Sequence, residues 1–471
     1  MRDVEASRAA DLPAARRLPL IRNRAGGLAA AAIAALSATG ANAAAKAATP
    51  KSIWEQETLT GDWGGARTAL KEKGIELSIV DINEILGVLS GGLERRASYE
   101  GRTEFSLDTD LQKLIGWTGG TTHVTVFQIR NGRRTAVENA GSLSDPSNID
   151  ALATTRLFTA WFQQNAFDDR VSLRIGQLAA DDEFVTSPTA AGLISGTFGW
   201  PDLHSANLPS GGPAYPLAAP GARLAVKPTS EMTLQAAVFS GDPAGADCTD
   251  DQKRCNRYGT TFSFHGGAFA IGELQYAVNQ DKDAIGLPGV YKLGGWYASA
   301  DFDDQHYGLS AAGTLVSLGA DPDASPLRHA GNYGFYAVAD QMVWRGKEQS
   351  LNLFLRGGAV PADRNLVSFY VDGGAGFKGL LPGRADDTLT FGIAYAGISP
   401  DAAALDRDAG NVVRDYELVL EASYAAQIAP WWTLQPDIQY IVHPHGGQNP
   451  DDPALRLGNA LIAGVRSSIK F

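Results

Sequence analysis

The sequence predicts an all-β fold: a transmembrane antiparallel β-barrel of about 16 strands, with a short N-terminal helix and inward-folded loop(s). Residues 416–424, 434–440 and 461–471 alternate between apolar and polar side chains, which is typical of strands with one apolar and one polar face. The last of these stretches ends on Phe471, on its apolar side. A strand that faces lipid outside and water inside can end in this way, whereas a soluble sandwich would rarely do so. The 53 glycines suit tight turns and closely packed strands.

Composition is compatible with this fold without deciding it. The chain has 471 residues, of which 20% are charged and 44% are hydrophobic, and both a soluble protein and a barrel with a wet lumen have such values. The net charge is -12, and the basic residues are mixed with acidic ones throughout. Nucleic acid is therefore not an expected partner.

The first 43 residues have the pattern of a secretory signal peptide. Four arginines between residues 16 and 24 precede an apolar run over 25–35, and Ala41-Asn42-Ala43 offers a small-residue cleavage site. The alternative is a buried helix, which the many alanines and glycines disfavour. Beyond this region no run reaches the ~18 apolar residues that a spanning helix needs, so a membrane crossing would require strands.

Residues 44–74 are expected to form a linker and a short helix, and residues 75–471 the transmembrane barrel. Asp62 can cap a helix over Trp63–Lys73, and Gly74 can end it in the left-handed conformation. Seventeen or eighteen strand-like runs follow, including Gly259–His265, and about 16 strands of ~10 residues account for the length. One run has a strongly polar face, made of Arg102, Glu104, Ser106, Asp108 and Asp110.

Residues 178–221 interrupt the succession of strands. This stretch holds Asp181, Asp182 and Glu183 and is rich in Gly, Pro and Ser. A loop of this length without regular structure is usually functional. We expect it to fold into the lumen as a constriction, because a barrel of this width would otherwise be open. An outward cap over the barrel remains the alternative.

Two cysteines, Cys248 and Cys255, are separated by a short polar stretch. In an exported chain such a pair is expected to form a disulfide that pins a loop. A metal site is the alternative, but it would need further ligands close by. No cofactor is expected.

Several motifs together resemble the carbohydrate-selective outer-membrane porins of the OprB type. They are Leu59-Thr-Gly-Asp-Trp-Gly-Gly-Ala-Arg67 with Leu70 and Gly74-Ile75, Gly91-Gly92 with Tyr99-Glu-Gly-Arg-Thr103, Asp110–Trp117, Arg174–Leu178 with Glu183-Phe184 and Ser187, Tyr215-Pro216, Phe239–Pro243, and Gln435–Pro444 with the ending at Phe471. His445 departs from the pattern, in a turn where a small residue is expected.

The resemblance covers residues 54–471 and implies a barrel in the bacterial outer membrane. It implies that sugars are the partners that pass, down their gradient, through a narrow charged eyelet. Outer-membrane lipid would surround the barrel, and the barrel-assembly machinery would read Phe471. Whether the barrels associate as a homotrimer stays open at this stage.

A channel for sugars must replace the hydrogen bonds that a sugar makes with water, without holding the solute. Side chains that donate and accept, together with aromatic faces, can do this. The candidates on the strands are Arg102, Glu104, Asp108, Arg174, Arg223, Lys227, Glu417, Asp437 and Gln439, and Trp200 and Tyr215 are the aromatic candidates in the long loop. Each of them could instead be a solvated or paired wall residue.

The competing classes are a less selective porin, a barrel hydrolase and a soluble lectin-like sandwich. A hydrolase is disfavoured because the chain has no G-x-S-x-G, and Gly308-Leu-Ser-Ala-Ala lacks the last glycine. The seven histidines are scattered, and His-x-His at 443 and 445 has no carboxylate cluster nearby. The sequence therefore predicts passive, selective diffusion of carbohydrates such as glucose and small oligosaccharides, with no chemical step and no metal.

Overall fold

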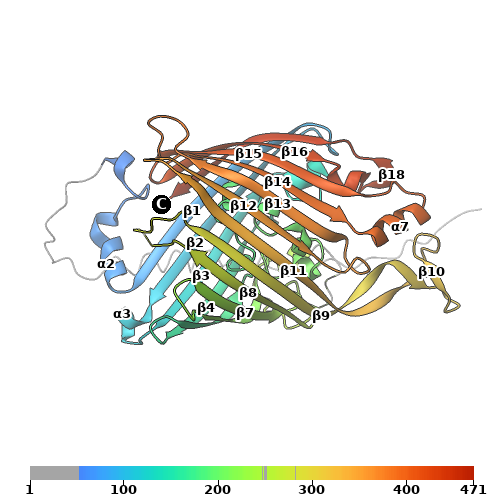
Figure 1. Cartoon of the computed structure of the whole chain (residues 1–471), viewed down its shortest axis with the longest axis horizontal. Helices are drawn as coiled ribbons and strands as arrows, with labels where there is room; N and C mark the ends of the chain where they lie inside the picture. Colours follow the sequence, from blue (N-terminus) through green and yellow to red (C-terminus); the bar gives the residue numbers. More distant parts are fainter. Residues whose placement is uncertain (1–51, 247, 249–251, 282) are drawn as a thin grey trace, which may run out of the picture. The chain divides into compact units, whose positions relative to one another are not determined.

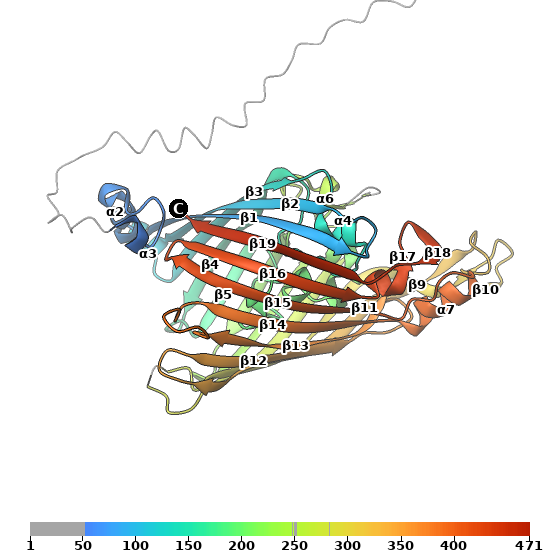
Figure 2. The ribbon, with the colours of Figure 1, turned by 90° about the horizontal axis from the view of Figure 1, so that it is seen from above.

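Sixteen strands close into an antiparallel barrel, in agreement with the predicted fold. The computed structural model describes residues 52–246, 248, 252–281 and 283–471. The predicted signal peptide and residues 44–51 of the predicted linker lie outside this range. Each strand pairs with its sequence neighbour along the wall, and β1 closes the barrel by pairing with β19 (Figures 1 and 2). Two further short pieces, β10 and the β17–β18 hairpin, lie outside this wall pattern.

The wall strands are β1 (Ile75–Ser90), β2 (Ala97–Asp110), β3 (Gly120–Asn131), β4 (Thr154–Ala166), β5 (Val171–Leu178), β6 (Ala219–Val226), β7 (Met232–Ser240), β8 (Ala268–Val278), β9 (Gly289–Leu309), β11 (Ser325–Arg345), β12 (Ser350–Ala359), β13 (Val367–Lys378), β14 (Thr388–Ile398), β15 (Tyr416–Ala429), β16 (Trp432–Val442) and β19 (Ala460–Lys470). The short strands are β10 (Leu315–Ser317), β17 (Gln448–Asn449) and β18 (Asp452–Arg456). The helical pieces are η1 (Ile53–Glu55), η2 (Trp63–Gly65), α2 (Ala66–Glu72), α3 (Leu111–Ile115), α4 (Ala136–Ala140), η3 (Ala190–Gly192), η4 (Gly196–Phe198), α5 (Asp202–Ser205), η5 (Pro209–Gly211), α6 (Gln252–Cys255), α7 (Pro400–Asp408) and η6 (Pro444–Gly447).

The alternation read from the sequence corresponds to inward and outward faces of the wall. On β2, Glu100 is 1% exposed and points inward, whereas Phe105 and Tyr99 are exposed on the outer surface. The three C-terminal runs form β15, β16 and β19 as predicted. Successive side chains of a strand point to opposite faces, so alternate residues lie on the outer and the inner face of the wall.

The predicted strand over Gly259–His265 was wrong. These residues form a loop between α6 and β8, and Phe262 has a positive φ of 48°. A bulky residue with positive φ turns the chain and interrupts an extended run. Apolar and polar residues alternate here without a partner strand.

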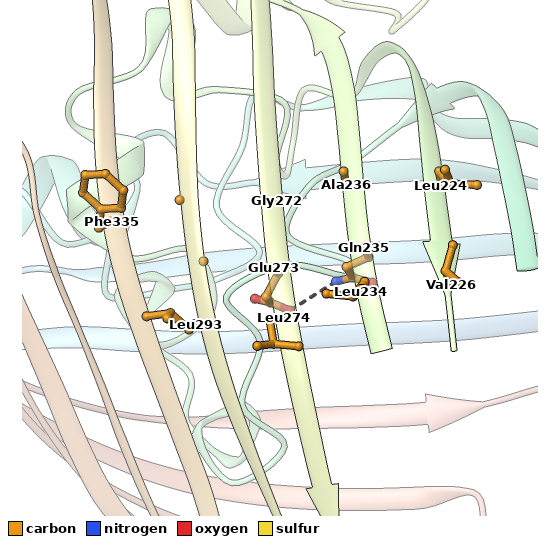
Figure 3. A pocket seen from close by; sticks show the side chains of 12 residues that line it. Leu224, Val226, Leu234, Gln235, Ala236, Gly272, Glu273, Leu274, Leu293 and Phe335 are labelled. Atoms are coloured by element: carbon orange, nitrogen blue, oxygen red, sulfur yellow. Dashed lines mark hydrogen bonds between the residues drawn. The ribbon is translucent and has the colours of Figure 1, made fainter. Parts of the chain in front are cut away.

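A shallow outward groove of about 510 Å³ crosses the strands β6 to β11 (Figure 3). Its floor is made of the small residues Ala236, Gly272 and Gly295, which are in register on neighbouring strands. Leu224, Leu274 and other apolar side chains form its sides. The groove is an apolar feature of the outer surface and has no part in the lumen.

No helix among the described residues is long and apolar enough to span a membrane.

The N-terminal segment fastens onto the end of the chain. The N–H of Leu59 donates to the carbonyl of Lys470 at 2.7 Å, and the guanidinium of Arg67 donates to the carbonyl oxygen of Phe471 at 2.7 Å. The same guanidinium donates to Thr58 Oγ1 at 2.6 Å and lies over the ring of Trp63. The opening motif therefore joins the first and the last parts of the barrel.

The two ends of the barrel differ. At the end that carries α2 the connections are short, for example residues 167–170 and 346–349. At the other end they are long, and β10 and α7 lie there (Figure 1). Cys248 and Cys255, in the connection between β7 and β8, are joined in a disulfide with a Cα–Cα distance of 5.8 Å.

Candidate pore constriction

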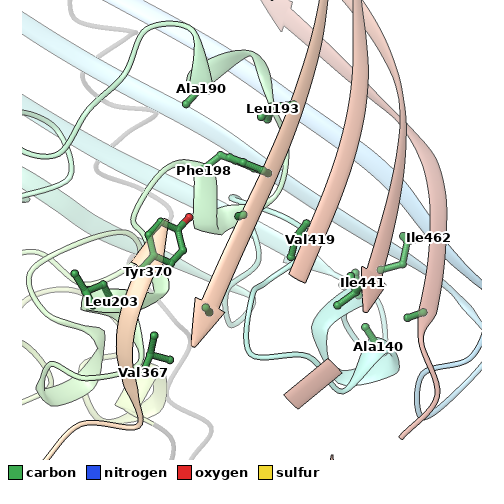
Figure 4. Close-up of a cluster of buried hydrophobic side chains, with 14 of the residues drawn as sticks. Ala140, Ala190, Leu193, Phe198, Leu203, Val367, Tyr370, Val419, Ile441 and Ile462 are labelled. Carbon is green, nitrogen blue, oxygen red and sulfur yellow. The ribbon is translucent and has the colours of Figure 1, made fainter. Parts of the chain in front are cut away.

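Two long connections fold into the barrel and pack against its inner wall. They are residues 132–153, between β3 and β4, and residues 179–218, between β5 and β6. Leu193, Phe198 and Leu203 of the second loop pack against Tyr370 and other inward side chains of β12 to β16 (Figure 4). Burial of these apolar side chains on the loop side and on the wall side holds the loop inside. The first inward loop was not predicted from the sequence.

Carboxylates of the wall bind the main chain of both loops. Glu417 accepts hydrogen bonds from the N–H groups of Leu143 and Ser144 at 2.8 and 2.7 Å. Glu421 accepts from Ile194 and Ser195 at 2.5 and 3.1 Å. A loop without regular structure leaves buried N–H groups unpaired, and these inward carboxylates satisfy them.

One arginine of the wall donates hydrogen bonds to carbonyl groups of the second loop. Arg356 on β12 is 2% exposed and donates to the carbonyl oxygens of Val185 at 3.0 Å and Phe198 at 2.8 Å. Its charge is balanced by Asp372 on the next strand, at 2.5 Å. The wall at β12 to β15 thus binds the loops by charge-assisted hydrogen bonds: its arginine donates to loop carbonyl groups, and its glutamates accept from loop N–H groups.

Charged side chains that are mostly half-buried gather on the opposite wall, on β2 to β5, together with the buried Arg223 of β6. Arg174 and Arg223 share the carboxylate of Glu183, each at 2.8 Å, and Glu183 lies in the inward loop. Both guanidinium groups also donate to Gln163 Oε1 at 3.0 Å. The pair Arg174–Glu183 therefore joins the wall to the loop where the two approach each other.

Arg102 continues this charged surface on β2. Its guanidinium lies 3.4 Å from Glu104, over the ring of Phe127 at 4.6 Å and over that of Tyr215 at 5.1 Å. The hydroxyl of Tyr215 donates to the carbonyl of Ile149, so Tyr215 links the two inward loops. The carboxylate and the two aromatic faces hold this guanidinium in place by ion-pair and cation–π contacts.

An aromatic platform lies beside these charges. Arg174 lies 3.9 Å over the ring of Trp161, and His123 stacks on the same ring at 5.0 Å. His123 is hydrogen-bonded to Asp108 at 2.6 Å. Alternating donors, acceptors and ring faces is the arrangement expected where polar solutes must pass without being held.

The structure separates the predicted site residues into two sets. It brings together Arg102, Glu104, Asp108, Arg174, Arg223 and Tyr215 on one side of the lumen. Glu417, Asp437 and Gln439 are at most 5% exposed and lie under the loops, where Gln439 donates to the carbonyl of Pro146. Glu417 and Gln439 bind a loop, and Asp437 accepts a hydrogen bond from Gln439, so all three are buried and do not line the free lumen, contrary to expectation.

Trp200 and Lys227 are also placed elsewhere. Trp200 is 8% exposed, packs on His204 at 4.5 Å and donates its indole N–H to the carbonyl of Gly211. Its role is therefore packing within the inward loop. Lys227 follows β6 in an exposed short turn, where its N–H donates to the carbonyl of Arg170.

Sequence reasoning missed Glu183, Gln163, His123 and Trp161 as members of this set. Each of the last three alternates with outward residues on β3 or β4, so the same period of two that identified Arg102 could have identified them. Glu183 lies in the loop, and no local pattern specifies which strand a loop residue will meet. Within the described part of the chain, no group of three or more potential ligands is placed to hold a metal ion.

Burial perturbs two carboxyl groups of the inward loop. Burial raises the pKa of Asp181 to about 6, although the N–H of Tyr215 donates to it at 2.9 Å. Burial likewise raises the pKa of Asp202 to about 6, against hydrogen bonds from Ser144 and Thr197. Desolvation exceeds the hydrogen bonds at both sites.

Comparison with known proteins gives consistent results. A family model described as "Carbohydrate-selective porin, OprB family" matches residues 94–471. The chain is 25% identical to Porin B of Pseudomonas aeruginosa, over 93% of this chain and 96% of that protein. It is 25% identical to the putative porin QuiX of Acinetobacter baylyi, over 89% and 94% of the two chains. The high-pH structure of Pseudomonas putida OprB has a TM-score of 0.78 at 23% identity, and the match covers 89% of this chain and 100% of that chain.

Proposed function

The chain belongs to the carbohydrate-selective porin family, OprB type, an outer-membrane family of sugar channels, and from this premise we propose how it selects sugars. The eyelet is the space between the inward loop at residues 181–183 and the wall at β2 to β6. Mono- and small oligosaccharides such as glucose pass there by diffusion, without a chemical step. The observation that carries the proposal is the row of paired charges Arg102–Glu104 and Arg174–Glu183–Arg223 beside the ring of Trp161, in which Arg223 is buried and the other four groups are half-buried.

The chemistry of this row fits a sugar. Guanidinium and carboxylate groups that are already paired can each form one hydrogen bond with a sugar hydroxyl. They return to their protein or water partners when the solute leaves. The ring of Trp161 offers an apolar face to the apolar side of a pyranose. The three arginines of the row have Glu104, Glu183 and, near Arg174, Asp182 as negative neighbours, so the row favours neutral polar solutes over ions of either sign.

We also propose an orientation of the barrel in the membrane and two further partners. The end with short connections and α2 faces the periplasm, because outer-membrane barrels have short periplasmic turns and longer outer loops. The barrel-assembly machinery reads Phe471 at that end. Association of the barrels as a homotrimer also belongs to the proposal.

Arg102→Ala tests the eyelet in planar bilayers. Without this guanidinium Glu104 loses its partner, so we expect the channel to become more cation-selective and glucose to block the current less. The matched control is Arg328→Ala, because Arg328 lies on the long β9–β11 hairpin with 63% of its side chain exposed.

An unchanged current–voltage curve together with unchanged glucose block in Arg102→Ala would remove Arg102 from the eyelet. Equal entry of glucose and of amino acids of similar size into liposomes would instead make the protein a general porin.

A further inference from the structure

The outward groove has a continuous floor of small side chains (Figure 3). Ala236, Gly272 and Gly295 pair in register on β7, β8 and β9. Leu224 of β6 pairs with Ala236 at one end of this row, and Phe335 of β11 pairs with Gly295 at the other. Neighbouring strands lie about 4.8 Å apart, so the row across these five strands is about 19 Å long.

A ridge of larger apolar side chains borders this floor on one side. Its members lie two residues away from the floor on each strand, on the same outward face, and pair in register from β6 to β9: Val226, Leu234, Leu274 and Leu293. The three leucines are exposed. The side chains that point into the groove are therefore apolar, and they lie on a wall that hydrocarbon surrounds.

On β12 to β14 a comparable outward glycine is already covered. Gly373 pairs with Leu355 on one side and with Ile393 on the other, and a Cβ at Gly373 would lie 3.4 Å from Leu355 Cδ1. A Cβ at Gly272 would meet only the carbonyl oxygen of Gln235, at 3.8 Å. The space over Gly272 is thus open. The whole groove has a volume of about 510 Å³, which is typical of a small-molecule site.

The groove lies in the half of the wall next to the short connections. Val226 is the last residue of β6 and Leu234 is the third of β7, and only residues 227–231 join these two strands. Leu293 is the fifth residue of β9. Strands of a membrane barrel are tilted by about 35–45°, so a row across them runs obliquely from the rim toward the middle of the membrane.

The rim beside the groove carries charges of both signs. Lys227 follows Val226 directly, and its N–H donates to the carbonyl of Arg170, so the turns that hold these two exposed cations adjoin. Asp169 and Glu231 belong to the same two turns and are also exposed. Cations and carboxylates at one rim suit a headgroup that contains both a phosphate and an ammonium group.

We propose that the groove binds one acyl chain of a zwitterionic phospholipid, of the phosphatidylethanolamine class, from the periplasmic leaflet. The chain lies on Ala236, Gly272 and Gly295, and the headgroup meets Lys227 and Arg170 at the rim. Phospholipids form the periplasmic leaflet of a bacterial outer membrane, so the choice of leaflet rests on the orientation proposed above. The site itself lies on the lipid side of the wall and is separate from the passage of sugars.

Gly272→Leu tests the site, with Gly87→Leu as the matched control. Both glycines face outward, and a Cβ at either meets only ordinary contacts, at 3.8 Å from Gln235 O and at 3.7 Å from Ala463 O. A leucine at position 272 fills the floor, whereas Gly87 lies on β1, outside the groove. Delipidated protein in mild detergent is titrated with phosphatidylethanolamine, and one-to-one adducts are measured by native mass spectrometry.

We expect saturable binding of one phospholipid to the wild type and to Gly87→Leu. Binding to Gly272→Leu should be at least about tenfold weaker, because the new side chain takes the place of several methylene groups of the lipid. The rate of glucose entry into liposomes should be the same for all three proteins. If Gly272→Leu fails to fold, as judged by heat-modifiable gel mobility, Ala236→Leu on the neighbouring strand takes its place.

Uptake of phospholipid by the wild type without saturation, or equal affinity of the wild type and a folded groove variant, would overturn the inference. Tighter binding of lipid A than of phosphatidylethanolamine in the same titration would overturn the assignment to the periplasmic leaflet. Absence of glucose entry with lipid binding intact would instead count against the proposed transport function.

Discussion

At the scale of single residues, the same type of side chain serves two purposes on the inner wall. Glu417 and Glu421 are fully buried and bind loop N–H groups, whereas Glu104 and Glu183 stay half accessible and pair with arginines. The period of two predicts that all wall carboxylates of this kind point inward. It cannot tell which of them a loop will cover, because that depends on contacts between residues far apart in the sequence. Of the two aromatic candidates in the long loop, Tyr215 lies beside Arg102, whereas Trp200 packs on His204 within the loop.

Asp202 gives a pH dependence whose sign is determined by burial. Its pKa is raised from 3.8 to about 6, so the folded protein favours the neutral acid. The stabilisation that the neutral Asp202 gives to the folded protein is complete below the pKa of the unfolded state, 3.8, and is lost as the pH rises through 6. The free energy of unfolding of the wild type should therefore fall, relative to Asp202→Asn, by about 2–3 kcal/mol between pH 4 and pH 7.

The measurement is the urea midpoint of both proteins in detergent at each pH. Parallel curves for the wild type and Asp202→Asn would show that Asp202 ionises as an exposed acid.

At the scale of elements, the strands and the inward course of the long loop over 178–221 were predictable, whereas the contacts of the loops were not. An apolar outer face and a polar inner face repeat on almost every strand, so the alternation locates β15, β16 and β19 directly. The unpaired run at Gly259–His265 shows the limit of this signal, since alternation without a partner strand does not make a sheet. The opening motif was visible as a motif, but its contacts with Lys470 and Phe471 span the whole sequence and could not be inferred locally.

The N-terminal segment should contribute to the stability of the closed barrel. Arg67→Ala removes the hydrogen bonds to Phe471 and Thr58 and the contact with Trp63. We expect a loss of about 1.5–3 kcal/mol in the free energy of unfolding, the usual contribution of a charge-assisted hydrogen bond.

The check is the temperature at which the folded band disappears on heat-modifiable gels. Lys71→Ala is the control, because Lys71 is 65% exposed and pairs only with the exposed Glu76. Equal temperatures for the two variants would show that the segment does not fasten the C-terminus.

At the scale of the whole molecule, three surroundings shape one barrel: lipid outside, packed loops against the far wall, and water along β2 to β6. The barrel class follows from the sequence, and so does the choice of side chains that face outward on each strand, because each face must suit its surroundings. The position of the passage does not follow, since it is set by which wall the two inward loops pack against. The buried contacts of Arg356, Glu417 and Glu421 determine that choice.

The most direct test of this account is modification of Asp182, an exposed residue of the inward loop that interacts electrostatically with Arg174 and Glu104. The Asp182→Cys variant is treated in liposomes with a bulky thiol reagent, and glucose entry is measured before and after treatment. Ile285→Cys, in the fully exposed turn between β8 and β9, is the control. The account predicts that treatment stops glucose entry through Asp182→Cys and leaves Ile285→Cys unaffected. Undiminished entry through fully modified Asp182→Cys would show that sugars do not pass between this loop and β2 to β6.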